Sequence, residues 1–342
     1  MFAVRREICA YAIDKTDFYG YYILTMELKD IISRFIITDT GGRADYSHGC
    51  AAAVGCFDGV HLGHRALIGE LCVRANEKRL PAVIFTFLPD DRPKQNTKLL
   101  ASRRGNLRLL AACGVNRVIE IPFGAVRDIP AEDFVRDILL RAFDVRLAVG
   151  GYNFRFGYRG SGDNALLAAV LAEGGAECFV TPAYTFCDIP VSSTEIRERI
   201  HRGDVRTANA MLGRQYSFSG TIIHGKGIGH MLGFPTINIH FPQNFTVPRY
   251  GVYASEVRLD GITYGGVTNI GIRPTFGGDT VPMSETFIFG FSGDVYGRTA
   301  AVSLCGFIRD ERRFESTDTL KNQIETDKIY AKSILSEGGP AI

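Results

Sequence analysis

The spacing of apolar residues changes near residue 213, and this change constrains the fold more than any other feature of the sequence. Before it, short apolar runs alternate with helical patterns, and after it apolar residues recur at every second position over several segments. The first pattern is typical of a parallel α/β sheet and the second of antiparallel strands. The 342 residues are enough for two domains of ~150 residues each, so we expect two domains of different class.

The first half contains apolar runs rich in Val, Ile and Phe, which are typical of buried strands. We expect these strands at Ala51–Val54, Ala82–Phe87, Arg117–Ile121, Leu147–Gly150 and Cys178–Thr181. Helical spacing predicts helices over His64–Glu77 and Asn164–Glu173, and another that begins at Pro130. Strands that alternate with helices form a parallel sheet covered on both faces, with ligands at the carboxyl ends of the strands. We therefore predict a doubly wound, Rossmann-like α/β domain.

The second half follows two short helical stretches, Glu195–Arg202 and Asp204–Leu212. Period-two segments then predict strands at Gly251–Val257, Ile262–Asn269, Glu285–Phe291 and Thr299–Leu304. Because Gly and Pro interrupt the pattern at short intervals, we predict a small antiparallel β-barrel. Ser316 is placed to cap a closing C-terminal helix.

Composition narrows the possible partners. The 39 basic and 37 acidic side chains leave a net charge of +2, which provides no basic field for nucleic acid. The chain lacks an apolar run of the ~18 residues that a membrane span requires. Its eight cysteines never form a C-x-x-C pair. We therefore expect neither a disulfide framework nor a zinc site, but free thiols in a reducing cytoplasm.

Residues 1–45 are expected to form an N-terminal extension, followed by domains over 46–213 and 214–335. Charges at Arg5, Arg6 and Glu7 and the short apolar stretch 21–25 do not fit a secretory signal. Met26, which precedes the amphipathic segment Leu28–Phe35, is a candidate native start. Residues 1–25 are then either foreign to the native protein or a loose tail, and the sequence leaves both readings open.

The first chemical motif is G-C-F-D-G-V-H-L-G-H at residues 55–64, between a predicted strand and a predicted helix. Its glycines let a backbone approach a ligand closely, and His61 and His64 lie at the positive end of the helix. Imidazoles at that position can donate hydrogen bonds to the phosphates of a nucleotide. The structural alternative is a tight turn with two surface histidines.

Two later segments fit the same kind of site. Residues 150–163 read G-G-Y-N-F-R-F-G-Y-R-G-S-G-D, a glycine-rich loop that includes Asn153. Residues 191–197 read V-S-S-T-E-I-R, and Ser193, Thr194 and Arg197 would place two hydroxyls and a guanidinium beside another helix N-terminus. Taken alone, the second segment is better explained as a plain helix cap with a solvated arginine.

The second chemical motif is G-K-G-I-G-H-M-L-G-F-P-T-I-N-I at residues 225–239. Side chains alternate along an extended segment, so Thr236 and Asn238 face the same side, and their oxygens suit a Mg²⁺ ion that carries a nucleotide. Phosphoryl transfer to an alcohol also needs a group that accepts the hydroxyl proton, and Glu285 is the candidate. A glycine-rich hairpin and an exposed edge-strand glutamate are the structural alternatives.

Together these segments resemble the bacterial bifunctional riboflavin kinase/FMN adenylyltransferase (FAD synthetase) family, from about residue 50 to 332. The resemblance implies an α/β nucleotidyltransferase domain and a β-barrel kinase domain, with His61, His64 and Glu285 as the catalytic residues. It places ATP and its phosphates against Gly55, Phe57, Asp58, Gly59, Gly63, Asn153, Ser193, Thr194 and Arg197, and in the barrel against Gly225, Lys226, Gly227, Thr236 and Asn238. Thr236 and Asn238 would hold the metal, and Asn153 and Arg309 would contact the flavin.

Three positions depart from the family pattern. Asp90 stands in F-L-P-D-D, where the family usually has F-x-P-H-P, and Phe287 and Gly290 stand where it commonly has His and Asp. We expect altered packing at the last two. For Arg309, an arginine–glutamate surface pair is an equally good interpretation of the sequence.

The sequence thus predicts an enzyme that phosphorylates riboflavin to FMN and adenylylates FMN to FAD, with ATP and Mg²⁺, in the cytoplasm and without nucleic-acid or membrane partners. Two alternatives stay open. One is a monofunctional riboflavin kinase with a degenerate adenylyltransferase half, which Asp90 favours. The other is a non-catalytic flavin-binding protein, against which the retained Thr236, Asn238, Glu285 and histidine pair argue. Oligomeric state is not specified by the sequence.

Overall fold

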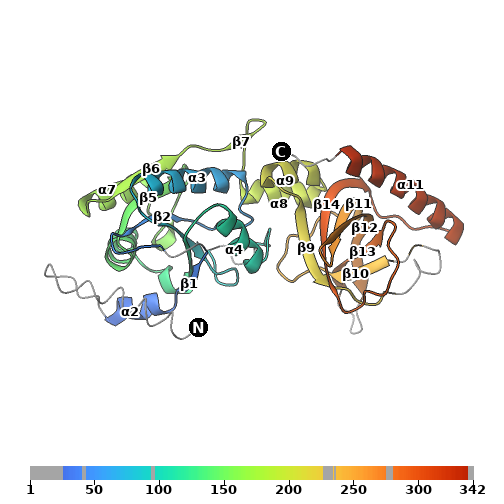
Figure 1. Ribbon diagram of the computed structural model, residues 1–342, viewed down its shortest axis with the longest axis horizontal. Helices are drawn as coiled ribbons and strands as arrows, with labels where there is room; N and C mark the ends of the chain where they lie inside the picture. Colours follow the sequence, from blue (N-terminus) through green and yellow to red (C-terminus); the bar gives the residue numbers. More distant parts are fainter. Residues whose placement is uncertain are drawn as a thin grey trace. The chain divides into compact units, whose positions relative to one another are not determined.

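The computed structural model describes residues 26–40, 44–93, 97–225, 234, 236–274 and 280–337, with side chains from 28 onward and without those of 273, 274 and 280. These residues fall into two compact units (Figure 1). Unit 1 comprises the chain to Thr97 together with Ser102–Pro190, and unit 2 comprises Lys98–Ala101 and the chain from Val191. The two helices expected over Glu195–Arg202 and Asp204–Leu212 therefore belong to unit 2.

Unit 1 is built on a six-stranded sheet with the order β1-β4-β3-β2-β5-β6. All neighbouring strands run parallel except β1, which is antiparallel to β4. The strands are β1 (Ile36–Asp39), β2 (Cys50–Val54), β3 (Ala82–Phe87), β4 (Arg117–Ile121), β5 (Val145–Gly151) and β6 (Glu177–Thr181). The predicted parallel α/β sheet is confirmed, and β3 and β4 have the expected bounds.

Helices cover both faces of this sheet. One core joins the sheet to α3 (Leu62–Glu77) and α4 (Arg103–Ala112), and the opposite core joins it to α2 (Met26–Ser33), η2 (Phe134–Ala142) and α7 (Asn164–Glu173). Alternate β2 residues contribute to the two cores, since Ala51 and Ala53 belong to the first and Ala52 and Val54 to the second. The short elements of unit 1 are α5 (Phe123–Val126), α6 (Ala131–Asp133), η3 (Tyr158–Gly160), β7 (Thr185–Phe186) and β8 (Ile189–Pro190).

The position of the first candidate site follows from the strand order. The chain builds outward from β2 in one direction through β3 and β4 and in the other through β5 and β6. Adjacent strands whose connections diverge in this way leave a crevice at their carboxyl ends, where open α/β sheets bind ligands. In unit 1 that point lies between β2 and β5, the two strands followed by the glycine-rich segments 55–64 and 150–163.

Unit 2 contains a six-stranded antiparallel sheet with the order β10-β13-β12-β11-β14-β9. Its strands are β9 (Tyr216–Thr221), β10 (Thr236–His240), β11 (Gly251–Leu259), β12 (Ile262–Pro274), β13 (Thr280–Ile288) and β14 (Thr299–Arg309). An isolated antiparallel bridge between Ile223 and Asn238 links the chain after β9 to β10 across the two edge strands. The sheet is therefore curled into a half-barrel, which confirms the predicted antiparallel barrel class.

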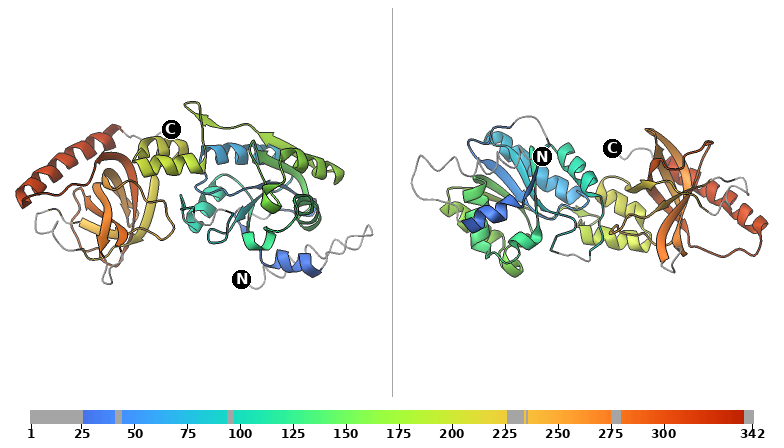
Figure 2. Two further views of the ribbon diagram at one scale, coloured as in Figure 1. Left: turned by 180° about the vertical axis from the view of Figure 1, so that it is seen from behind. Right: turned by 90° about the horizontal axis from the view of Figure 1, so that it is seen from below.

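Helices α8 (Ser193–Arg202), α9 (Val205–Leu212) and α11 (Thr317–Glu337) complete unit 2 (Figure 2). Asn209 of α9 donates its side-chain amide to Leu304 O and accepts a hydrogen bond from Tyr216 N, which attaches α9 to β14 and β9. The predicted cap of the last helix is confirmed, because Ser316 Oγ accepts a hydrogen bond from Thr319 N at 3.2 Å.

The two faces of the curled sheet differ. On β13, Ser284, Thr286 and Ile288 point to the buried interior, and the residues between them are half-buried on the outer face. A small core of unit 2 consists of Val252, Ala254, Val267 and Ala331. Because Ala331 belongs to α11, this helix packs on the outer face of the sheet. The expected strand Glu285–Phe291 is displaced in the structure, because pairing with β12 begins at Thr280 and ends at Ile288. Glu285 therefore lies inside a strand instead of opening it.

Candidate active sites

The loop between β2 and α3 brings two imidazole rings together at a helix N-terminus. His61 is the N-cap of α3, and its Nδ1 accepts a hydrogen bond from His64 N at 3.2 Å. The two rings stack with centroids 3.6 Å apart. The turn that delivers them needs a left-handed backbone, with φ of 78° at Gly59 and 39° at Val60. The predicted histidine pair is therefore assembled at the positive end of a 16-residue helix.

The environment of this pair sets its charge. Burial lowers the pKa of His64 well below its usual range, and the nearby charge of His61 lowers it further. Because Nδ1 of His61 accepts the backbone hydrogen bond, neutral His61 carries its proton on Nε2. The pair is thus suited to bind phosphate oxygens mainly through N–H donation and the helix dipole.

The same loop carries a buried carboxylate, Asp58, which faces the segment after β3. Arg92 Nη1 lies 3.8 Å from Asp58 Oδ2, and both side chains are about nine-tenths buried. Arg92 also donates a hydrogen bond to Thr97 O, and Gly59 N donates to Asn106 Oδ1 at 2.9 Å. Neither Arg92 nor Asn106 was predicted as a site residue, and no motif signals them, because each reaches the loop from a segment more than 30 positions away.

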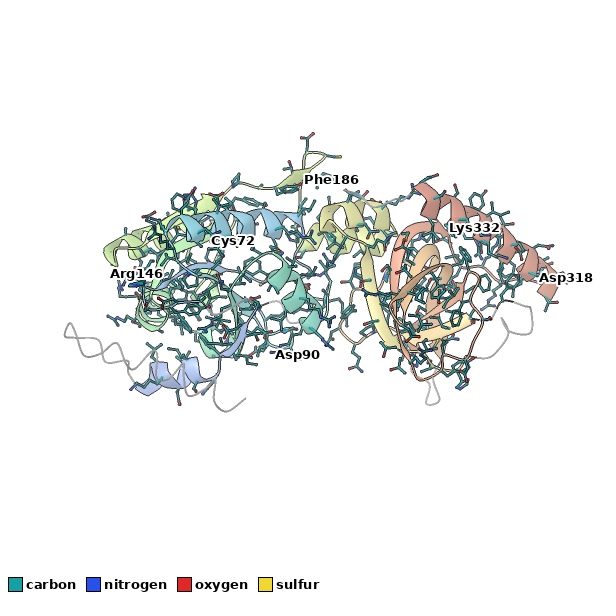
Figure 3. All side chains as sticks on the ribbon, viewed as in Figure 1. Cys72, Asp90, Arg146, Phe186, Asp318 and Lys332 are labelled. Atoms are coloured by element: carbon teal, nitrogen blue, oxygen red, sulfur yellow. The ribbon has the colours of Figure 1, made fainter. Side chains whose placement is uncertain are left out.

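The two aspartates before Arg92 point elsewhere. Asp91 accepts hydrogen bonds from Gly124 N at 3.2 and 3.1 Å, at the start of α5. Asp90, which stands where the family has histidine, is exposed (Figure 3). In this segment the buried charged group is therefore the cation Arg92. The carboxylate of Asp90, which departs from the family pattern, lies on the surface.

The loop after β5 is fixed by a residue that was predicted only as the start of a helix. Asn164 Nδ2 donates to Gly151 O at 2.9 Å, and its Oδ1 lies where a side chain at Gly150 would collide, 2.5 Å from an added Cβ. Gly150 thus has to be glycine for Asn164 to hold the turn. Asn153 follows on this loop as an exposed side chain, at the carboxyl end of β5.

The third segment that was predicted to bind phosphate, residues 191–197, lies in unit 2. Ser192 is the N-cap of α8 and accepts a hydrogen bond from Glu195 N at 3.2 Å, and Ser193 and Thr194 occupy the first helical turn. Arg197 Nε donates to Lys98 O at 2.6 Å. A joint site of these residues with the histidine pair of unit 1 stays a prediction.

The second candidate site is on the outer face of the curled sheet. Thr236 Oγ1 donates a hydrogen bond to Glu285 Oε1 at 2.9 Å. Asn238 is the cross-strand partner of Glu285 on β10, and Asn269 is its partner on β12. The pairing register therefore brings together the three residues predicted from the sequence, Thr236, Asn238 and Glu285, on one face of adjacent strands.

Asn238 has the features of a ligand side chain. It is 2% exposed, and its Oδ1 has no hydrogen-bond partner among the described residues. A Cβ at Gly225 would lie 2.4 Å from Asn238 Nδ2, so a glycine there lets the backbone pass over the amide. Lys226 and Gly227, predicted to follow in this loop, lie outside the described residues.

The oxygen donors of this site fit a hard cation. An amide oxygen, a hydroxyl and a carboxylate are the ligand types that Mg²⁺ prefers. Among the described residues, no cluster of three His, Cys, Asp or Glu side chains could hold a metal by itself. The donor set therefore fits Mg²⁺ that arrives with nucleotide phosphates, which is how this ion is usually bound.

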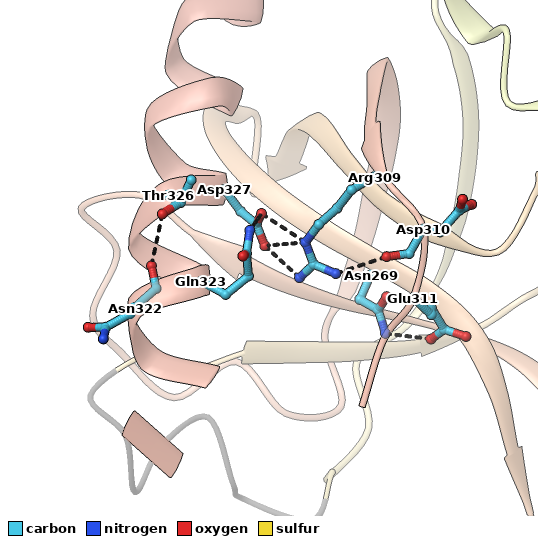
Figure 4. A network of polar contacts seen from close by, with 8 residues as sticks. All are labelled: Asn269, Arg309, Asp310, Glu311, Asn322, Gln323, Thr326 and Asp327. Atoms are coloured by element: carbon cyan, nitrogen blue, oxygen red, sulfur yellow. Dashed lines mark hydrogen bonds and ion pairs between the residues drawn. The ribbon is translucent and has the colours of Figure 1, made fainter. Parts of the chain in front are cut away.

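Arg309 is held by α11 (Figure 4). Its Nε and Nη2 donate to the buried carboxylate of Asp327 at 3.0 and 2.7 Å, and Gln323 donates to the same carboxylate. Glu311, the expected surface partner of Arg309, instead accepts a hydrogen bond from Asn269 at 3.0 Å. The flavin contact predicted for Arg309 stays a prediction, while its contacts here anchor the helix.

The two departures in the kinase motif have local explanations. Phe287 packs edge-to-face against Phe234, with ring centroids 5.3 Å apart. Gly290 lies in the turn after β13 with φ of 63°, a conformation that glycine adopts without strain. The contact between Glu285 and Thr236 is formed beside Phe287, and the expected change in packing stays a prediction.

Comparison with known proteins gives matches to both halves. Residues 43–195 match the FAD synthetase family model, and residues 212–335 match the riboflavin kinase model. The bifunctional riboflavin kinase/FMN adenylyltransferase of Escherichia coli K12 is 35% identical over 305 residues, covering 86% of this chain and 95% of that protein. The protein of the same description from Bacillus subtilis is 34% identical over 287 residues, covering 82% and 90%.

A solved structure is similar over most of the chain. It is described as a macrolide-efflux protein from Streptococcus pneumoniae, with a TM-score of 0.76 and 26% identity. The match covers 86% of this chain and 97% of that one. The similarity therefore extends over both units of the fold.

Proposed function

The chain belongs to the family of bacterial bifunctional riboflavin kinases/FMN adenylyltransferases, and from this we infer an enzyme with both activities. It phosphorylates riboflavin to FMN with ATP, and it adenylylates FMN to FAD with release of pyrophosphate. Both family domains are present in one chain, which supports this function over a kinase with a degenerate adenylyltransferase half. We propose that the histidine pair of unit 1 serves adenylyl transfer and that the Thr236–Asn238–Glu285 group serves the kinase.

The kinase step is supported above all by the contact between Thr236 and Glu285. The 5′-hydroxyl of riboflavin attacks the γ-phosphorus of ATP, ADP leaves, and the hydroxyl proton needs an acceptor. Glu285 takes that proton, and the hydrogen bond from Thr236 at 2.9 Å holds its carboxylate in one orientation. Thr236 and Asn238 would hold Mg²⁺, which when bound neutralises charge on the transferred phosphoryl group.

The adenylyl-transfer step makes different demands. An oxygen of the FMN phosphate attacks the α-phosphorus of ATP, and pyrophosphate leaves. The nucleophile is already an anion, so no proton has to be removed, and the enzyme has to position reactants and stabilise charge. His61 and His64 supply N–H donors at the N-terminus of α3, and we propose that Asn153, Ser193, Thr194 and Arg197 complete the phosphate contacts.

We propose that Gly55, Phe57, Asp58, Gly59 and Gly63 shape the loop around the ATP phosphates, and that Gly225, Lys226 and Gly227 do so in the kinase. The exposed position of Asp90 supports an active adenylyltransferase, because its charge is not buried in the site.

The described residues contain no helix long and apolar enough to cross a membrane. Seven cysteines are described and all are free thiols, which supports a cytoplasmic location.

The test is a chromatographic assay of the purified protein with ATP and Mg²⁺, started in parallel from riboflavin and from FMN. We expect FAD from both substrates. FMN that accumulates without conversion to FAD would overturn the adenylyltransferase proposal and would make Asp90→His the next variant. Absence of FMN from riboflavin would overturn the kinase proposal.

A further inference from the structure

Helix α11 is fastened to the same face of the sheet that carries Glu285. Val267 of β12 and Phe287 of β13 are cross-strand partners, and Val267 belongs to the core that includes Ala331 of α11. Because side chains alternate along a strand, Phe287 and Glu285 share this face. The bidentate contact of Arg309 with Asp327 then fixes the rotation of α11 about its own axis.

The residue next to Asp327 reaches toward the kinase residues. Lys328 Nζ lies 5.1 Å from the ring centroid of Phe234 and 5.6 Å from that of Phe287. The two rings contact each other edge-to-face, so a single ammonium group lies over both. The Lys328 side chain is 21% exposed, and partial burial strengthens an attraction between a cation and aromatic rings.

The two rings flank the catalytic residues in the sequence and in the sheet. Phe234 precedes Thr236 by two positions, and Phe287 follows Glu285 by two positions. Phe287 is also the cross-strand partner of Thr236. The residues that deliver the hydroxyl and the carboxylate to each other therefore adjoin the one ammonium group of Lys328.

We propose that Lys328 is a positioning residue of the kinase site, which holds the Phe234–Phe287 pair and through it the Thr236–Glu285 contact. This inference rests on the proposed kinase function of unit 2. The lysine does not need to touch a substrate in this role. Without this lysine, Thr236, Asn238 and Glu285 are arranged to bind the metal–nucleotide in a smaller fraction of molecules. The apparent affinity for the metal–nucleotide falls in proportion to that fraction.

Two further contacts of lysines on α11 help to distinguish this role from general packing. Lys328 Nζ also lies 2.7 Å from Glu325 Oε2, but that carboxylate is half exposed, and surface pairs of this kind contribute little. Lys332, one turn along α11, lies 5.6 Å from the ring of Phe289. Phe289 follows the end of β13 at Ile288, so Lys332 makes the same kind of contact with a ring outside the Phe234–Phe287 pair and provides a matched control.

The test compares Lys328→Met, Lys328→Arg and Lys332→Met in the full-length protein. We expect Lys328→Met to raise KM for ATP about tenfold, the change that corresponds to one well-placed cation–π contact, with a smaller effect on kcat. The Mg²⁺ concentration for half-maximal FMN formation should rise in parallel. Lys328→Arg keeps a cation over the rings and should restore both values, and Lys332→Met should match the wild type.

Conversion of FMN to FAD by the same preparations reports on unit 1 and should be unchanged in all three variants, and urea denaturation compares the stability of unit 2 in Lys328→Met with that in Lys332→Met. The inference is overturned if Lys328→Met leaves KM for ATP and the Mg²⁺ requirement equal to those of Lys332→Met, or if Lys328→Arg fails to restore them. If the wild type itself makes no FMN, the proposed kinase function fails instead. The two failures are thus distinguishable.

Discussion

The two candidate sites each contain a buried or half-buried carboxylate, and its partner differs between them. In unit 1, Asp58 faces the guanidinium of Arg92 at 3.8 Å. In unit 2, Glu285 accepts a hydrogen bond from the neutral hydroxyl of Thr236 at 2.9 Å. The first carboxylate thus faces a cation within a buried loop, whereas the second faces a hydroxyl on the sheet face proposed for phosphoryl transfer.

This difference matches the two reactions. An FMN phosphate attacks ATP as an anion, so the first site can dedicate its carboxylate to structure and present imidazoles to the phosphates. Riboflavin attacks as an alcohol, so the second site has to keep a carboxylate for the proton. The contrast implies that each carboxylate is required for a different property, catalysis in one case and folding of the loop in the other.

The largest effect is expected for Glu285→Gln. The amide keeps the shape and the contact with Thr236 but does not accept the riboflavin proton, so the rate of FMN formation should fall by about 10²- to 10⁴-fold. Conversion of FMN to FAD should be unaffected. Initial rates of both reactions, measured by chromatography on one preparation, check this. Loss of both activities would contradict the assignment.

Asn238→Ala should have the next largest effect on the kinase. It removes a buried amide oxygen that has no hydrogen-bond partner in the part of the chain that the structure describes, so the Mg²⁺ concentration for half-maximal FMN formation should rise by about 10- to 100-fold. Asn238→Asp keeps an oxygen at this position and serves as the control. An unchanged Mg²⁺ requirement in the alanine variant would remove Asn238 from the metal site.

Arg92→Met should act on stability. Removal of one partner leaves Asp58 as a buried charge, which costs about 3 kcal/mol in the free energy of unfolding. The double variant Asp58→Asn/Arg92→Met no longer buries that charge and should recover part of the loss. Urea denaturation of the wild type and the two variants measures this, together with FMN-to-FAD rates. Equal destabilisation by the single and double variants would show that the pair is not coupled.

The smallest effect is a pH dependence from His64. Its pKa in the folded protein lies below the 6.5 of a free imidazole, so the unfolded chain binds this proton first as the pH falls. The free energy of unfolding should therefore decrease below about pH 6.5, by at most about 1.4 kcal/mol per pH unit for this group. His64→Asn should show a shallower decrease over the same range. Identical pH profiles would contradict the burial of a neutral imidazole.

Much of the fold could be predicted because it follows from local pattern. The parallel strands are continuous apolar runs, and β3 and β4 were predicted to the residue. Strand β13 was displaced, because its ends are set by pairing with β12 and its own pattern continues past Ile288. Helix α4 was not predicted, since R-R-G-N-L-R-L-L-A-A is polar and contains a glycine.

The same distinction applies to the sites. Thr236 and Asn238 were predicted to share a face because side-chain alternation is a local property. The partners that complete the sites come from distant segments: Arg92 for Asp58, Asp327 for Arg309 and Lys328 for the aromatic pair. No spacing rule connects such residues, since their contacts are fixed by how strands and helices pack.

The most direct test of two independent sites is a mixing experiment with Glu285→Gln and His64→Ala. Each protein is incubated alone with riboflavin, ATP and Mg²⁺, and then the two are combined. We predict that neither variant alone forms appreciable FAD and that the mixture does, because FMN made by His64→Ala is adenylylated by Glu285→Gln. A mixture that forms no more FAD than the separate variants would contradict the assignment of one reaction to each site.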